Sequence, residues 1–371
     1  MCIRDRPHTI LALCPGHPDP AWHEVLFIHR STAKDDIWLG HYISKEEAVA
    51  VSGIRNICWF EEFGHVISEM MQHCKNVYLN EIPLKCTITK EINLLEDRLR
   101  GLFPGQTYGN LTPMITELRQ VKEYEELALI REAATITGKA FERLAKAVKP
   151  GVKEYALEAE LMYGFLLNGA TGAAFETIVA SGSNACILHY VRNDKTMHAG
   201  ELVLVDFGAE YANYAADCTR VLPVSGVFSK RQRECYEAVL LFHDEAVKLM
   251  KPGTTIEEIN HKIYTLMQEH HIRLGLYSQQ DVDKQTTAFE CCKNYFMHSV
   301  SHFLGIDVHD VGSRKHVLKP GMVITCEPGL YIREEGIGIR LENDILITEN
   351  EAINLTEHIP IKPSEIEYFM K

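Results

Sequence analysis

The residues best able to do chemistry are carboxylates beside apolar, strand-like runs in the second half of the chain. Asp206 ends one such run, Asp217 precedes the next, and Glu327 ends a third. A carboxylate among buried apolar residues needs a partner or a cation, because an unpaired buried charge is costly. Asp206 and Asp217 would approach each other across a short hairpin, where two carboxylates repel unless a proton or metal ion lies between them. The alternative is that both are turn or capping residues.

Histidines and a second polar strand extend this set. His298, His302 and His309 stand among apolar residues within twelve positions, and core histidines with satisfied hydrogen bonds rarely explain such a density. Arg340 and Glu342 belong to a strand-like segment over residues 338–348. Because side chains alternate between the faces of a strand, these two side chains share one face.

Together these residues predict a metal centre. Carboxylate-rich ligation suits hard or borderline divalent ions such as Mn²⁺, and five side chains with bridging carboxylates suit two ions rather than one. Two nearby ions can share a water molecule, lower its pKa and polarise a carbonyl oxygen, which is hydrolytic chemistry. A structural zinc site would need a tetrahedral Cys and His spacing that the sequence lacks. The candidate ligands are Asp206, Asp217, Glu327, Glu342 and one of the histidines.

The elements that must position these residues repeat along the chain. Helices are predicted over residues 117–148 and 153–168, with Lys-Pro-Gly between them, and the same order recurs over residues 230–250 and 256–271. Strand-like segments follow each pair, which favours a duplicated α+β unit. A third Lys-Pro-Gly, at residues 319–321, has no flanking helices, so a chance match of the tripeptide is the alternative.

The first third of the chain predicts a separate, smaller domain. Apolar runs such as residues 24–28 alternate with helical stretches such as residues 45–52, which is typical of a small α/β domain. Its scattered histidines, His17 among them, are predicted to be solvated surface residues. Residues 1–6 match nothing that follows, so the domain is predicted to be truncated at its start. We expect an N-terminal α/β domain over 7–110, a linker over 111–120 and a catalytic domain over 121–371.

Composition limits the function classes. The 371 residues carry a net charge of −13, which disfavours nucleic-acid binding. The chain has no run of about 20 apolar residues and no secretory signal, so no membrane role is expected. Eleven cysteines, without a zinc-type pair, favour a reduced, cytoplasmic setting.

These motifs, in this order, resemble the Xaa-Pro aminopeptidases (aminopeptidase P), within the pita-bread metallopeptidases that also include prolidases. The resemblance covers residues 117–371, and residues 38–53 are similar to part of that family's N-terminal domain. It implies an α+β fold. A pita-bread catalytic domain, with a duplicated α+β unit around a central antiparallel sheet, would follow the smaller α/β domain. The motifs that carry it lie in residues 175–190, 205–208, 216–220, 298–312, 327–332 and 338–348.

The resemblance also assigns roles. It selects His302 as the imidazole ligand, and it implies that Arg340 holds the ligand Asp206 in place. His189, His298 and His309 would be the histidines around the substrate. Of the ligands, Asp217 and Glu342 would contact one or both ions. The full set of metal ligands that it implies is Asp206, Asp217, His302, Glu327 and Glu342.

The implied activity is metal-dependent release of the N-terminal residue from peptides with proline in the second position. A hydroxide bridging two divalent ions, expected to be Mn²⁺, would attack the carbonyl before the proline, with Glu327 as general base and proton shuttle. His298 and His309 would hold the carbonyl and the tetrahedral intermediate, and His189 would contact the proline side. A homo-oligomer, dimer or tetramer, is expected. For the wall of the proline pocket, Phe175 and Tyr190 are the candidates.

Three alternatives stay open at this point. A Xaa-Pro dipeptidase (prolidase) would use the same ligands but prefer dipeptides. A methionine aminopeptidase is disfavoured by the large N-terminal domain. A pita-bread module that has lost its metals and only binds peptides is disfavoured because all five ligands, with His298 and His309, are retained.

Overall fold

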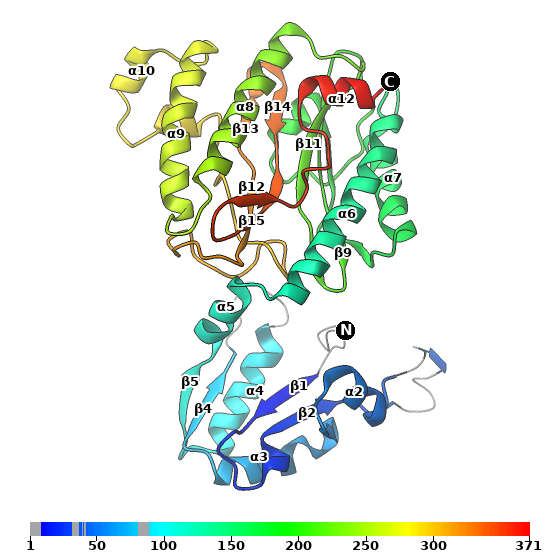
Figure 1. The fold of residues 1–371 in the computed structure, drawn as a ribbon, viewed down its shortest axis with the longest axis vertical. Coiled ribbons are helices and arrows are strands. Elements are labelled where there is room, and N and C mark those ends of the chain that lie inside the picture. The colour runs from blue at the N-terminus through cyan, green and yellow to red at the C-terminus, as the bar shows by residue number, and fades with distance from the viewer. Residues whose placement is uncertain (1–8, 32–36, 39, 41, 81–88) are drawn as a thin grey trace. The chain divides into compact units, whose positions relative to one another are not determined.

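The computed structural model describes residues 9–31, 37–38, 40, 42–80 and 89–371, so the opening segment 1–6 lies outside the described residues. The chain divides into two compact units, Met1–Thr116 and Glu117–Lys371 (Figure 1). The boundary lies within the segment predicted as a linker. That segment is not irregular, however, because Thr112–Gln120 forms helix α5. Pro113 stands in the first turn of α5, where a missing N–H costs no hydrogen bond. No described helix combines the length and apolar character that a membrane span requires.

Unit 1 contains two small sheets. Strands β1 (Ile10–Leu13), β2 (Glu24–Ile28) and β3 (Asn56–Trp59) form one sheet, in which β1 and β2 are antiparallel and β2 and β3 are parallel. Strands β4 (Asn76–Leu79) and β5 (Thr107–Asn110) form a parallel pair. The helices are α2 (Lys45–Ser52), α3 (Phe63–Gln72) and α4 (Thr89–Leu102). The predicted strand at 24–28 and helix at 45–52 are confirmed.

Helix α3 presents an apolar face to the first sheet of unit 1. Val66, Ile67 and Met70 are buried on that face, together with Val25 and Phe27 of β2. Its polar residues stand on the other side of the helix, with the 3.6-residue period of an amphipathic helix. The helix is therefore fixed by its apolar face, while its polar face is left for other contacts.

Two helix pairs frame unit 2. Helix α6 (Tyr124–Ala147) packs against α7 (Glu154–Leu167), and α8 (Lys230–Leu249) packs against α9 (Ile256–Arg273). The predicted single helix over 117–148 is wrong, because α5 and α6 are separate helices. The backbone leaves helical geometry between them, where Val121 pairs with Met322 as an isolated β-bridge. The N–H of Glu123 is then accepted by the Glu126 carboxylate at 2.8 Å, which starts α6.

The Lys-Pro-Gly tripeptides end helices in the same way in both pairs. Gly151 follows α6 with φ of +87°, and Gly253 follows α8 with φ of +90°. Glycine adopts this left-handed conformation without steric cost. Gly321, in the third copy, has φ of +87° although no helix precedes it. The tripeptide is therefore a turn, and the repeated helix pairs carry the evidence for duplication.

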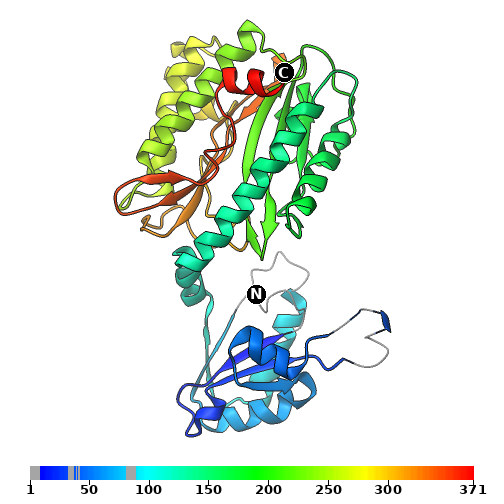
Figure 2. The same cartoon turned by 45° about the vertical axis from the view of Figure 1, so that its right-hand side comes forward.

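The strands of unit 2 are antiparallel wherever they pair. One sheet has the order β11–β8–β7, and a second has the order β12–β15–β16. The pair β13–β14 lies beside β8 and β11, and α6 and α7 run side by side across the strands (Figure 2). The bounds are β7 Ile178–Ser181, β8 Leu202–Phe207, β11 Cys218–Pro223, β12 Val323–Cys326, β13 Gly329–Ile332, β14 Ile337–Arg340, β15 Asn343–Ile347 and β16 Ala352–Asn354.

Shorter elements complete unit 2. Strands β6 (Gly172–Ala173), β9 (Ala209–Tyr211) and β10 (Tyr214–Ala215) form a small sheet. Because β9 and β10 lie between β8 and β11 in the chain, the predicted hairpin carries an insertion. Helices α10, α11 and α12 span Gln279–Asp283, Glu290–Lys293 and Pro363–Phe369. The predicted single strand over 338–348 is also wrong, because β14 ends at Arg340 and β15 begins at Asn343 in another sheet.

Candidate metal centre and substrate site

Two adjacent strands carry the first pair of carboxylates. Asp206 lies near the end of β8 and Asp217 directly precedes β11, and these strands pair so that Thr219 is opposite Asp206. Asp217 is only 4% exposed. Its backbone N–H donates to Asp344 Oδ2 at 3.1 Å, which fixes the turn into β11. The hairpin therefore delivers both carboxylates to one end of the sheet.

The break between β14 and β15 delivers the next pair of side chains. Arg340 and Glu342 both contact the hydroxyl of Thr219: Arg340 Nε donates to it at 3.0 Å, and it donates to Glu342 Oε2 at 2.6 Å. The two side chains thus meet at one hydroxyl group, although Glu342 lies between the two strands and not on a strand shared with Arg340. Leu341, between them, is fully buried in the apolar core.

His302 faces the carboxylates with one nitrogen. Its Nε2 lies 3.5 Å from Asp217 Oδ2 and 3.7 Å from Glu327 Oε1. Its Nδ1 lies 2.9 Å from the carbonyl oxygen of Phe303. A ring N–H donated to that carbonyl holds the proton on Nδ1, so the lone pair of Nε2 is directed at the carboxylates.

This donor set fits divalent cations. Asp217, His302 and Glu342 each offer a ligand atom, and these atoms all lie within 4.8 Å of one another. Among the described residues, Asp206 Oδ1 and Asp217 Oδ1 are buried without a hydrogen-bond partner. Buried carboxylate oxygens that lack donors are the ligands expected for a hard or borderline cation.

The raised pKa values of the clustered carboxylates also favour a bound cation. Burial, with Asp206 close by, raises the pKa of Asp217 well above its usual range, and burial beside Asp217 does the same for the pKa of Glu342. Burial raises the pKa of Glu327 to about 7. Carboxylates crowded together out of water are unstable as anions unless positive charge is supplied. A bound cation would supply it.

Arg340 organises one edge of the cluster. Its Nη2 donates to Asp206 Oδ2 at 2.6 Å, and its Nη1 donates to the Tyr331 hydroxyl at 3.1 Å. The side chain is nearly fully buried. With its fixed fork of donors, one guanidinium therefore orients the carboxylate of Asp206 and the phenol of Tyr331 together.

The three other candidate histidines differ in their surroundings. His298 has both nitrogens engaged, Nδ1 near the Ser299 carbonyl at 2.9 Å and Nε2 near the Tyr331 hydroxyl at 2.8 Å, and burial lowers its pKa to about 3. The ring of His309 stands edge-on to that of His302 at 4.3 Å, and burial lowers its pKa to about 4. His189 is exposed.

Sequence reasoning missed Asp344. This residue is fully buried, receives the N–H of Asp217, and has a pKa that burial raises to about 8. The signal was present in the sequence, because Arg340, Glu342 and Asp344 follow at intervals of two. Tyr331 was missed as well, since a tyrosine in an apolar strand reads as core.

An ion cluster behind His309 was also missed. The Asp310 carboxylate accepts from Lys122 Nζ at 3.2 Å and from Arg119 Nη2, and the side chains of Lys122 and Asp310 are each 1% exposed. These contacts join the α5–α6 junction to the segment that carries His309. Nothing in the sequence pairs residues so far apart.

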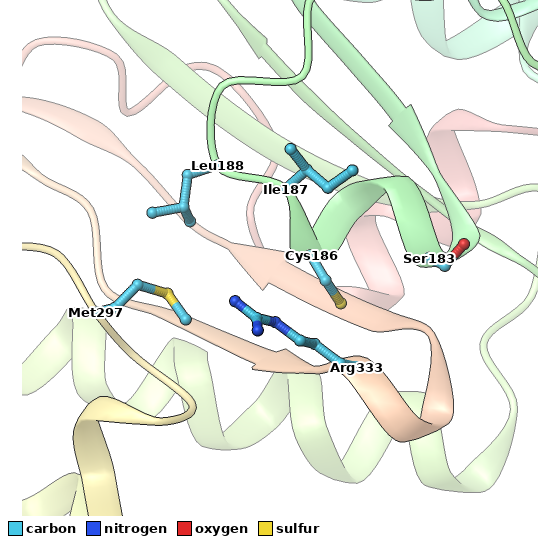
Figure 3. A pocket seen from close by; sticks show the side chains of 6 residues that line it. All are labelled: Ser183, Cys186, Ile187, Leu188, Met297 and Arg333. Carbon is cyan, nitrogen blue, oxygen red and sulfur yellow. The ribbon is translucent and has the colours of Figure 1, made fainter. Parts of the chain in front are cut away.

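A hollow of about 420 Å³ opens beside η4 (Gly182–Cys186), as Figure 3 shows. Leu188 and Met297, which line it, are chain neighbours of His189 and His298, and the side chain of Arg333 extends into it toward Met297. A neighbouring hollow of about 620 Å³ is lined by residues that include His189. Two cavities therefore adjoin the segments that carry two of the candidate histidines.

Tyr190 also lines the larger hollow, but its hydroxyl is already engaged in hydrogen bonds. It is buried, and its hydroxyl donates to Glu154 Oε2 at 2.8 Å and lies 3.2 Å from Asp194 Oδ1. Glu154 in turn accepts from the N–H and the hydroxyl of Ser181, each at 2.7 Å. Tyr190 thus belongs to a buried polar network that ties the start of α7 to β7.

Comparison with known proteins gives consistent matches. The model of metallopeptidase family M24 matches residues 128–349, and that of the aminopeptidase P N-terminal domain matches residues 4–78. Xaa-Pro aminopeptidase of Escherichia coli is 37% identical over 99% of this chain and 86% of its own length. The structure of aminopeptidase P from E. coli with the inhibitor Pro-Leu has a TM-score of 0.84 and 36% identity, covering 94% of this chain and 82% of that one. Proline aminopeptidase P II from Yersinia pestis has a TM-score of 0.84 and 34% identity, with 94% and 83% covered.

Proposed function

The chain belongs to metallopeptidase family M24, and from this premise we infer that it acts as a metal-dependent Xaa-Pro aminopeptidase. It is a hydrolase in which a pita-bread catalytic domain follows an N-terminal domain along the chain. It releases the first residue of peptides whose second residue is proline. The observation that carries this function is the buried cluster of Asp217, His302 and Glu342 in a chain whose relatives match over nearly its whole length. The dipeptidase alternative is not favoured, since the relatives reported above are aminopeptidases.

We propose that two divalent ions, Mn²⁺ in our assignment, bind to the predicted ligands. Four of the five ligands are carboxylates, which suit Mn²⁺ better than a thiolate-preferring ion. Bound ions supply Lewis acidity, which polarises a carbonyl and lowers the pKa of a water molecule. The ligands in this proposal are Asp206, Asp217, His302, Glu327 and Glu342.

In this proposal Glu327 is the proton carrier. A general base works best when its pKa lies near the working pH, and burial raises the pKa of Glu327 to about 7. Its Oε2 lies 3.4 Å from His298 Nδ1, and its Oε1 lies 3.7 Å from His302 Nε2. The carboxylate therefore lies between two imidazoles, where it would accept a proton and return it to the leaving amine.

His309 and His298 would act as neutral groups. With pKa values lowered to about 4 and about 3, both are uncharged at neutral pH and able to donate one ring N–H. We assign carbonyl and oxyanion binding to His309, whose ring lies beside His302. His298, which is bonded through Nε2 to Tyr331, would act by holding that phenol, and Arg340 holds it from the other side.

His189 and the two hollows would receive the peptide beyond the first residue. His189 lines the larger hollow, and Arg333 brings a positive charge into the smaller one. A proline ring needs an apolar surface, which Leu188 and Met297 offer. A peptide carboxylate would find its counter-charge at Arg333 (Figure 3).

We propose further that the chain is cytoplasmic and forms a homo-oligomer. All nine described cysteines are free thiols, as a reduced compartment requires. Helix α7 exposes a run of large apolar side chains that a second copy could cover. These side chains are Tyr155, Met162, Tyr163, Leu166 and Leu167.

The function is tested by removing metal with a chelator, adding Mn²⁺, and comparing a Xaa-Pro dipeptide with a Xaa-Pro-Xaa tripeptide. Metal-dependent release of the first residue from the tripeptide, with the dipeptide slower, is expected. Dipeptide-only cleavage would establish the dipeptidase instead. Asp217→Asn serves as the inactive control, and absence of cleavage by a folded, Mn²⁺-loaded protein would contradict the proposed function.

A further inference from the structure

A second group of metal-ligating side chains lies in unit 1. His17, Glu69 and His73 each offer one ligand atom, and these atoms all lie within 4.8 Å of one another. His17 belongs to the loop between β1 and β2, whereas Glu69 and His73 stand one turn apart at the end of α3. The rings of His17 and His73 meet edge to face, with centroids 4.5 Å apart.

His17 is not the solvated surface residue that the sequence predicts. It is 6% exposed, and its Nε2 is buried without a hydrogen-bond partner in the described part of the chain. Its Nδ1 is already occupied, because it accepts the Asp19 N–H at 3.1 Å and also lies 3.2 Å from the Asp19 carbonyl oxygen. Nε2 is thus the nitrogen left over, and leaving a buried polar atom without a partner is unfavourable.

A cation bound at Nε2 of His17 would give this buried nitrogen a partner. It would require a lone pair on Nε2 and therefore the proton on Nδ1, which would give up the N–H that it accepts from Asp19 and donate to the Asp19 carbonyl oxygen instead. Metal-bound histidines are commonly oriented in this way, with the second ring nitrogen donating to a backbone carbonyl. Two contacts fix the backbone of His17 within this loop. The His17 N–H donates to the Cys14 carbonyl at 3.0 Å, and His23 Nε2 contacts the His17 carbonyl at 2.9 Å.

The helix supplies the other two ligands at the correct spacing. Positions i and i+4 lie on the same face of a helix, and Glu69 Oε1 is 4.0 Å from His73 Nε2. Their side chains are 43% and 35% exposed, so an ion can enter from solvent. The site therefore has one buried anchor and two accessible ligands.

We propose that His17, Glu69 and His73 bind a zinc-type divalent cation that joins the β1–β2 loop to helix α3. Two imidazoles and one carboxylate are a set that suits Zn²⁺, Co²⁺ or Ni²⁺, with a fourth position open to water. Unlike the carboxylate-rich cluster of unit 2, this set does not favour Mn²⁺. Its role is structural: a cation bound only to the folded chain stabilises the fold by mass action.

Co²⁺ binding to the full-length, reduced protein tests this proposal. The background carries Asp217→Asn and Glu342→Gln, which weaken the unit 2 cluster with side chains of the same size. We expect His73→Ala in this background to bind one Co²⁺ fewer per chain by equilibrium dialysis, and Glu69→Gln to weaken the same site about tenfold. The matched control is His65→Ala, an exposed histidine on the same helix, which should bind as the background does.

A second measurement protects the test against misfolding. Zn²⁺ should raise the thermal unfolding midpoint of the background and of His65→Ala, but not that of His73→Ala, while all three show the same helical circular dichroism. Equal Co²⁺ stoichiometry in His65→Ala and His73→Ala would overturn the proposal. A thiolate charge-transfer band would also overturn it, because Cys14 and Cys74, whose sulfur atoms lie 3.2 Å apart, would then be the ligands.

Discussion

The two candidate metal clusters are built in opposite ways. The cluster of unit 2 is rich in carboxylates and lies at the ends of buried strands, where Thr219 holds Glu342 and Arg340 holds Asp206. The cluster of unit 1 is rich in histidine and joins a loop to the solvent side of a helix. The carboxylates of the unit 2 cluster are buried away from water, which costs stability, as is common at reactive sites. The unit 1 cluster has one buried imidazole, and its carboxylate lies near the surface.

The largest expected difference is in activity. Asp217→Asn removes a predicted ligand and should lower kcat/KM for a Xaa-Pro-Xaa tripeptide by on the order of 10³-fold or more, since metal-ion catalysis contributes several kcal/mol. His73→Ala should leave kcat/KM within about twofold. Steady-state assays in Mn²⁺ compare the two variants. A large loss in His73→Ala would mean that the clusters are not independent.

The two clusters should also differ in the metal ion that each prefers. After treatment with a chelator, Mn²⁺ should restore peptidase activity at concentrations that leave the unit 1 cluster empty, because imidazole ligands bind Mn²⁺ far more weakly than Zn²⁺. Zn²⁺ added afterwards should raise the unfolding midpoint further. Calorimetry with each metal alone and then both checks this order. If Mn²⁺ alone produced the whole stabilisation, the proposed division of the two clusters by metal would fail.

A buried histidine should make the free energy of unfolding depend on pH even when no metal is bound. His271 is fully buried in unit 2, and burial lowers its pKa to about 3, below its unfolded value near 6.5. The unfolded chain therefore binds more protons between these values, so its contribution to stability is complete above about pH 6.5 and is lost as the pH falls. The free energy of unfolding should decrease by up to about 1.4 kcal/mol per pH unit from this group.

Denaturant titrations in chelator at pH 7.5 and pH 5 measure that decrease. His271→Gln, which cannot take up the proton, should show a smaller difference between the two pH values. An unchanged difference in His271→Gln would assign the acid sensitivity to other groups, such as the carboxylates of the metal centre.

The smallest expected effect concerns the metal-free protein. Asp217→Asn removes one of several crowded, desolvated carboxylates, so the metal-free variant should be more stable than the metal-free parent by about 1 kcal/mol. His73→Ala should change metal-free stability by less than about 0.5 kcal/mol, as substitutions at exposed positions do. Urea unfolding in chelator gives both values. Destabilisation of metal-free Asp217→Asn would show that the Asp217 carboxylate stabilises the fold instead, through its contact with His302 Nε2 at 3.5 Å.

The same contrast explains what the sequence could predict. Asp206, Asp217 and Glu327 were found because a charged residue beside an apolar run is conspicuous, and Arg340 and Glu342 because strands alternate with a period of two. The choice of His302 among its neighbours needed a resemblance, since spacing alone gives every histidine the same claim. His17 was misjudged because its ring packs against His73, which lies far along the chain at the end of α3.

The secondary structure was predicted where apolar periodicity is strong. Helices α2 and α8 begin where their capping residues Ser44 and Ser229 stand. The failures occur where tertiary contacts override local pattern. The break between α5 and α6 accommodates the pairing of Val121 with Met322, and the break between β14 and β15 allows adjacent residues to join different sheets.

The buried ammonium of Lys122 has a consequence for anyone who wishes to excise the catalytic unit. The match to the M24 family model begins at residue 128, and α6 begins at Tyr124, so either position looks like a natural start for an expressed fragment. Both would leave out Lys122 and Arg119, the two cations that neutralise Asp310. A buried carboxylate deprived of its partners costs about 3–5 kcal/mol. A fragment that begins at Glu117 would keep them, at the expense of only a few residues.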